Sequence, residues 1–293
     1  TPATPLTAPD PFGAYLEAPD AEIDHPLYIQ RMNLRMLHLF LGAESGALDH
    51  LPNGLRDERL RRYVALVQGY FAGGGPDAAR MPGLAWPFTA YFLRDTMDIR
   101  DVMDAAVANA RAYGGDWEIA VILMFRTHMV VDSPGGMAGV DDGLAELRVL
   151  CSRVGDRWVR AQVSSAVGEA AMGRGRFEEA KGAYEEALAL AYEVGAHTET
   201  PFLIARLAEL AFRAGDREGA LAGLDEATEA SDRHGVADAH AFIQLLRAHI
   251  ALEDGDVTHA RALCEQAREE SGRGTPPPQF RAALNAVEIG RAS

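Results

Sequence analysis

Apolar and small residues recur every three or four positions along much of this chain, and polar residues separate them. Between residues 156 and 172 the spaced positions are Val159, Val163 and Val167, followed by a pair of alanines at 170–171. This period is that of one face of an α-helix. After Gly175 the spacing resumes in a second segment, at the positions Phe177, Ala180, Tyr184, Ala187, Leu188 and Ala191. The pattern therefore predicts two helices joined by a glycine turn.

The helical pattern repeats with a step of 40 residues. The segment 175–180 begins with glycine and ends with alanine, and it recurs at 215–220 and at 255–260. A second series of glycines keeps the same step, at Gly115, Gly155, Gly195 and Gly235. Because glycine adopts positive φ without strain, both series predict helix ends.

Small residues hold fixed places in these repeats, so the paired helices can approach each other closely. Larger residues then fill the groove between successive pairs. Cys264 stands in the place of Tyr184 and is expected to be a buried hydrophobic residue. The small residues are Gly168, Ala208 and Ala248 in the first helices and Ala180, Ala220 and Ala260 in the second helices.

These features resemble the tetratricopeptide repeat. The match is good for residues 155–194 and less close for 195–234 and 235–274. It is weak for 115–154, where Val140 replaces the alanine. The usual period of that family is about 34 residues. Its helices would therefore be longer here. The resemblance implies an all-α fold, a right-handed superhelical solenoid of antiparallel helix pairs with about thirteen helices.

The pattern divides the chain into four parts. Residues 1–24 are rich in proline and predict an extended linker, and residues 25–114 predict degenerate helical repeats, with helices over 25–41, 55–71, 84–94 and 98–113. Residues 115–274 hold the four repeats. Residues 275–293 predict a capping helix after three prolines. The start without methionine suggests a piece of a longer protein.

Composition narrows the function classes. The net charge is −15 and basic runs are absent, which argues against direct contact with nucleic acid. No apolar run reaches the length of about 18 residues that a membrane helix needs, so a cytoplasmic protein is expected. Two cysteines, Cys151 and Cys264, are too few for a disulfide framework.

Catalytic, cofactor and metal signatures are missing from the sequence. There is no phosphate-binding loop, and the glycine run 73–75 indicates a helix break instead. No pair of histidines has the four-residue spacing of helical metal ligands, and His128 is expected to pack against a neighbouring helix. Asp156, Asp216 and Asp256 each follow a glycine and are expected to cap helices. The chain is therefore predicted to be no enzyme.

The resemblance also implies a binding groove, because the first helix of each tetratricopeptide pair lines the inner face. Exposed aromatic and methionine side chains there would bind an amphipathic protein segment or a modest apolar ligand. An equally strong alternative is that the phenylalanines pack on the next repeat. The groove positions are Phe125, Met129, Gln162, Glu169, Phe202, Glu209, Arg213, Phe242 and His249.

The repeats at 173–191 are similar to those that end large actinobacterial regulators, of which the antibiotic-regulatory (SARP-like) activators are the best known. The resemblance covers residues 84–274. It implies a sensor or interaction domain of a transcriptional regulator, in which binding shifts a contact with upstream modules. A plain adaptor that docks a peptide or helix is the alternative, and an enzyme on a solenoid scaffold is a third.

Overall fold

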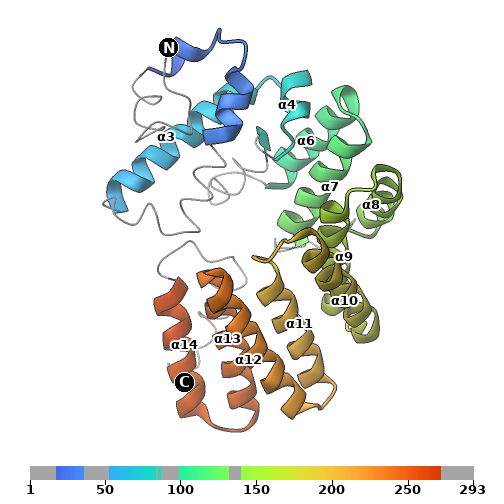
Figure 1. Ribbon diagram of the computed structural model, residues 1–293, viewed down its shortest axis with the longest axis vertical. Helices are drawn as coiled ribbons and strands as arrows, with labels where there is room; N and C mark the ends of the chain where they lie inside the picture. The colour runs from blue at the N-terminus through green and yellow to red at the C-terminus, as the bar shows by residue number, and fades with distance from the viewer. Residues whose placement is uncertain (1–17, 36–52, 84, 87–98, 132–139, 272–293) are drawn as a thin grey trace. The chain divides into compact units, whose positions relative to one another are not determined.

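The computed structural model describes residues 18–35, 53–83, 85–86, 99–131 and 140–271, and these residues are helical with turns and without strands (Figure 1). The predicted all-α fold is confirmed at this level. The chain forms two compact units, residues 1–130 and residues 131–293. The predicted linker before residue 18, the capping helix over 275–293 and most of the helix over 84–94 lie outside the described residues.

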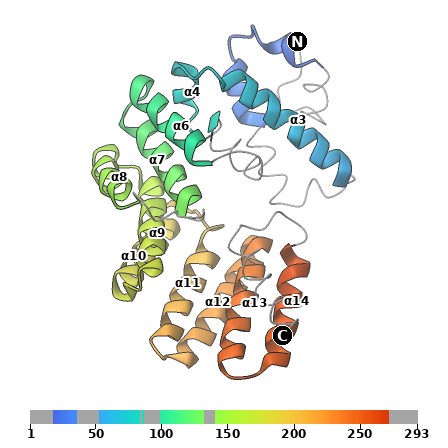
Figure 2. The same cartoon turned by 180° about the vertical axis from the view of Figure 1, so that it is seen from behind.

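The helices of the C-terminal unit follow one another in hairpins. Each of the helices from α9 to α14 contacts the next along the chain, and α11 also contacts α13. Both views show α11, α12, α13 and α14 side by side in chain order (Figures 1 and 2). Their bounds are α8 Val140–Val154, α9 Arg157–Gly173, α10 Phe177–Val194, α11 Thr200–Arg213, α12 Arg217–His234, α13 Ala237–Glu253 and α14 Val257–Ser271.

Glycines end these helices as predicted. Gly195 and Gly235 are the C-caps of α10 and α12 and have φ values of 74° and 69°. In the turns inside the hairpins, Gly175, Gly215 and Gly255 have φ values of 71°, 86° and 80°. A side chain at these positions would meet backbone strain, which explains why the sequence keeps glycine at a fixed step.

Aspartates cap the helices that follow, which confirms a second expectation. The carboxylates of Asp156 and Asp216 accept hydrogen bonds from the backbone N–H groups of Val159 and Gly219, at 3.0 and 2.9 Å. The carboxylate of Asp256 accepts one from the backbone N–H of His259 at 3.0 Å. Each cap satisfies a donor that the first turn of a helix leaves open.

The small residues allow close packing between the helices of a pair, but they do so in two ways. A Cβ built on Gly168 of α9 would lie 2.5 Å from Cε1 of Tyr184 of α10. In the next pair, a Cβ built on Gly223 of α12 would lie 2.9 Å from the Cβ of Ala208 of α11. The first pair thus makes room for a ring, and the second for a methyl group.

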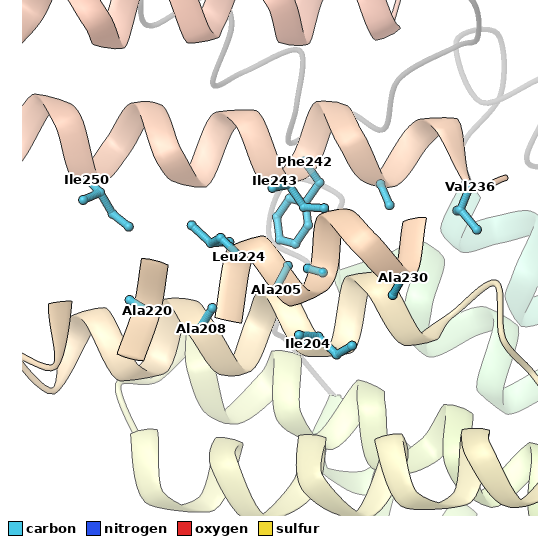
Figure 3. Close-up of a cluster of buried hydrophobic side chains, with 12 residues drawn as sticks. Ile204, Ala205, Ala208, Ala220, Leu224, Ala230, Val236, Phe242, Ile243 and Ile250 are labelled. Atoms are coloured by element: carbon cyan, nitrogen blue, oxygen red, sulfur yellow. The ribbon is translucent and has the colours of Figure 1, made fainter. Parts of the chain in front are cut away.

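Phe242 lies in the core between α11, α12 and α13. Its ring points from α13 towards Leu224 and Ala205 and is only 5% exposed (Figure 3). The expectation of an exposed aromatic is therefore wrong for this residue, and the alternative of packing between repeats is correct. Cys264 is also buried, 5% exposed, as expected from its equivalence to Tyr184.

The N-terminal unit contains α3 Asn53–Phe71, α4 Pro76–Arg80, α6 Ile99–Tyr113 and α7 Asp116–Val131. Helical residues 28–35 pack with α3 and α4, and the Tyr63 hydroxyl donates a hydrogen bond of 2.7 Å to the carbonyl of Met32. The break at 73–75 separates α3 from α4 as predicted. The extended lead-in is wrong for Pro19–Glu22, which form a 3₁₀ helix in which the Ala21 N–H donates a hydrogen bond of 3.2 Å to the Ala18 carbonyl. Glu22 also pairs with Arg35 at 2.8 Å.

Candidate functional site

The predicted groove residues divide between the two units. Phe125 and Met129 lie on α7 of the N-terminal unit and are half-buried, and the Phe125 ring lies over Gly83. The other positions belong to the C-terminal unit and lie on its first helices. They are Gln162 and Glu169 on α9, Phe202, Glu209 and Arg213 on α11, and Phe242 and His249 on α13.

An arginine that the sequence pattern does not single out connects these residues. The Arg206 guanidinium on α11 donates a hydrogen bond of 2.8 Å to Glu169 on α9 and another of 3.0 Å to Glu209 on its own helix. The exposed fraction of the three side chains is 21%, 29% and 10%. Two carboxylates thus hold one partly buried cation between neighbouring first helices.

The same guanidinium lies over an aromatic ring. Arg206 Cζ is 4.6 Å from the ring centroid of Phe242 on α13, and the Phe202 ring is 6.1 Å from that centroid. A planar guanidinium is favoured on an aromatic face because the electron-rich ring attracts the cation. Phe242 therefore contributes to the site from within the core. The charges of Glu169 and Arg206 also act on the Tyr184 hydroxyl. We call Glu169, Tyr184, Phe202, Arg206, Glu209 and Phe242 the Arg206 cluster.

Electrostatics keep the Arg206 guanidinium charged and the Tyr184 hydroxyl neutral. Burial acts to lower the pKa of Arg206, but the charges of Glu169 and Glu209 outweigh burial and raise the pKa above its usual value. Burial and then the charge of Glu169 raise the pKa of the Tyr184 hydroxyl. Arg206 is therefore a cation and Tyr184 a neutral phenol.

Two exposed residues, Arg213 and His249, lie on the same first helices as members of the Arg206 cluster. Arg213 donates a hydrogen bond of 2.9 Å to Glu209, and its Cζ is 5.6 Å from the ring centroid of Phe177. The His249 ring is edge-on to Phe212 at a centroid distance of 5.8 Å. Both Arg213 and His249 are exposed. They offer a cation and an imidazole to a partner beside half-buried apolar side chains.

Gln162 belongs to a different contact. On the N-terminal half of α9 the indole N–H of Trp158 donates a hydrogen bond of 3.1 Å to Glu199, and Gln162 also hydrogen-bonds to Glu199. Burial raises the pKa of Glu199, and these two hydrogen bonds oppose the rise. Gln162 therefore takes part in a link between α9 and the start of α11.

Repeat phase alone could not identify Arg206, Trp158 or Glu199. Periodicity assigns a residue to a helix face, whereas these contacts join positions about 40 residues apart on neighbouring hairpins. One signal was present: the acid Glu169 and the base Arg206 are 37 residues apart, three short of the 40-residue step. Within the described ranges, no cluster of three or more possible metal ligands is found, and no helix is long and apolar enough to cross a membrane.

Comparison with known proteins adds no relative. No protein-family model matches this chain, and no curated protein matches it.

Proposed function

We propose that this chain is a non-catalytic protein-interaction domain of the tetratricopeptide type, a right-handed superhelical solenoid that binds a protein segment along the first helices α9, α11 and α13. The resemblance of the repeats supports the architecture. The Arg206 cluster supports the binding role, because it holds charged and aromatic side chains of successive helices in one fixed arrangement. Fixed side chains lose little conformational entropy when a partner binds.

The exposed residues beside the cluster indicate the chemistry of the partner. Arg213 and His249 offer positive and hydrogen-bonding groups, and Phe202 and Phe212 offer partly accessible apolar surface. An amphipathic helix with acidic residues next to an apolar stripe matches these groups. A small apolar ligand with an acidic group would match the same side chains and is a second candidate.

In this proposal the partner segment belongs to the upstream modules of a bacterial transcriptional regulator, and its release controls activation. A change of this kind requires different affinities for two states of the regulator. A stand-alone adaptor that docks a peptide or helix without regulatory output remains the alternative. The similarity of residues 84–274 to the repeats of actinobacterial regulators favours the first function.

A photo-crosslinking amino acid at position 249 tests the binding face. The matched control carries it at position 229, an exposed position on the second helix α12. The variant is expressed in its native gene context. The regulator function then predicts that position 249 crosslinks to another part of the same polypeptide, and mass spectrometry identifies the crosslinked segment. Crosslinks to one separate protein would support the adaptor instead. Equal crosslinking from both positions, or none from either, would refute the binding face.

A further inference from the structure

A second candidate site lies between α8, α9 and α10, and the Arg206 cluster contributes no residue to it. It is a cavity of about 780 Å³, open to solvent, lined by the C-terminal half of α8, one side of α9 and the N-terminal half of α10. Small-molecule sites in proteins have volumes of about 300–1,000 Å³. The cavity is thus large enough for a small ligand.

Two small residues of α10 form the floor of the cavity. A Cβ built on Gly182 of α10 would meet no atom within 4 Å, and the neighbouring Ala183 also lines the cavity. The floor is therefore shaped by small residues and is apolar, with Val163 and Val167 beside it.

Charged residues line the walls in two groups. Arginines come from α8 and α9, and glutamates come from α10. Several of these charges are already neutralised by the protein. Arg160 pairs with Glu186, Ser164 donates a hydrogen bond of 2.9 Å to Glu186, and Glu179 pairs with Arg176 at 2.8 Å. Arg157 pairs with Glu193.

Two wall residues have no such partner among the described residues. Arg148 of α8 and Glu178 of α10 are exposed and make no hydrogen bond or ion pair there. Arg148 acts only at longer range, as one of the charges that help to lower the pKa of Glu186 against the effect of burial. The cavity therefore offers one open cation and one open anion on different helices.

We propose that this cavity binds short zwitterionic peptides, with the ligand's carboxylate on Arg148 and its ammonium group on Glu178. The arginine fork matches a carboxylate in geometry, and a glutamate is a strong acceptor for an ammonium group. The apolar floor at Gly182 and Ala183 takes the backbone and small side chains between the two ends. This site is independent of the proposed binding face.

The balance of charges favours a zwitterion over a simple anion. The lining contains the arginines 148, 157 and 160 against four carboxylates, those of Asp156, Glu178, Glu179 and Glu186. A phosphate or a free carboxylate would therefore meet no net positive potential. Cys151 also lines the cavity, and burial followed by the charge of Asp156 raises the pKa of its thiol, so it adds no charge.

Glycine peptides with free or blocked ends provide the probes. We expect calorimetry to detect binding of di-, tri- or tetraglycine with free ends, at one site per chain. Acetylation of the amino end, amidation of the carboxyl end, or both should each weaken binding about tenfold or more, since each removes a charge-assisted hydrogen bond. Equal binding of free and blocked peptides, or no binding of any peptide at millimolar concentration, would overturn the proposal.

Variants assign each end of the peptide to its residue. Arg148→Gln should bind the free peptide no better than the native chain binds the amidated one, and Arg148→Lys should restore part of the affinity. Glu178→Gln should bind the free peptide no better than the native chain binds the acetylated one. Arg261→Gln and Glu229→Gln change exposed residues of α14 and α12 that do not line the cavity and should leave affinity unchanged. Equal losses in these controls would also overturn the proposal.

Discussion

The ring of Tyr184 occupies the space beside Gly168 that a side chain at residue 168 would need, because a Cβ there would lie 2.5 Å from Cε1 of the tyrosine. Tyr184 is fully buried. The close crossing of α9 and α10 thus requires glycine at position 168 when position 184 carries a tyrosine ring. In the next hairpin the equivalent positions hold Ala208 and Leu224.

Gly168→Ala is expected to destabilise the protein by up to about 2 kcal/mol. Overpacking costs about 1–3 kcal/mol, and the better helix propensity of alanine offsets about 1 kcal/mol. Adding Tyr184→Leu recreates the alanine–leucine combination of the next hairpin and should recover part of the loss. Urea unfolding, monitored by helical circular dichroism, measures both effects.

Gly182→Ala is the matched control for this experiment. It lies in the same hairpin, but its Cβ would contact nothing within 4 Å. The substitution should therefore raise the free energy of unfolding by up to about 1 kcal/mol. A similar loss in both variants would show that the Tyr184 contact does not limit residue 168.

The sequence alone predicted the elements whose physics is local. Helix ends at Gly195 and Gly235 could be predicted because positive φ favours glycine whatever surrounds it. Caps at Asp156 and Asp216 could be predicted for a similar reason, since the bonded N–H lies three residues ahead. By contrast, α4 Pro76–Arg80 is too short to show a period and was not predicted.

The candidate site depends on contacts that no local pattern contains. Phe242 was placed in an open groove because it lies in phase with Phe202 on the first helices. Its burial depends on Leu224 and Ala205, which come from two other helices. The central position of Arg206 likewise follows from its reach to both Glu169 and Phe242. Long helices bring such residues together, and repeat phase does not fix which side chain turns inward.

Arg206→Met is expected to lower the free energy of unfolding by about 2–3 kcal/mol. The change leaves the partly buried carboxylate of Glu169 without its cation and leaves Glu209 with only the exposed Arg213, which is the costly way to break such a cluster. Changing both carboxylates to glutamine in the same chain should recover most of the loss, because no uncompensated buried charge then remains. Denaturant unfolding of the single and triple variants measures the recovery.

The exposed ion pair of Arg217 and Asp254 is the control for this charge removal. Arg217 donates to Asp254 at 3.1 Å on the surface, with both side chains well exposed. Arg217→Met should leave the free energy of unfolding almost unchanged, because surface ion pairs contribute little. A comparable cost for the two arginines would contradict the special position of Arg206.

Asp216→Ala is expected to cost about 1 kcal/mol through loss of the α12 cap. Without the carboxylate, the backbone N–H of Gly219 keeps no side-chain acceptor. Asp216→Asn should retain most of the stability, because an amide oxygen accepts the same hydrogen bond. Glu229→Ala, at an exposed position of α12, is the control for a lost negative charge. If thermal unfolding shows the same loss of stability for Glu229→Ala and Asp216→Ala, capping is not the cause.

Glu199→Gln is expected to stabilise the protein at neutral pH. Burial raises the pKa of Glu199 in the folded state, while hydrogen bonds from Trp158 and Gln162 act in the opposite direction and only reduce the rise. A carboxyl group whose folded pKa lies above its unfolded value favours folding while it is protonated. That contribution is complete below the unfolded pKa and is lost as the pH rises through the folded pKa.

The stability advantage of the Glu199→Gln variant over the native chain should therefore shrink as the pH falls from 7 towards the unfolded pKa of a glutamate, about 4.3. Urea midpoints of both proteins, measured at several pH values in this window, give the difference. Trp158→Phe removes a donor to the carboxylate and should enlarge the advantage of glutamine at pH 7. The exposed Glu229→Gln should show no such trend. An advantage of glutamine that grows as the pH falls would mean that the hydrogen bonds outweigh burial at Glu199.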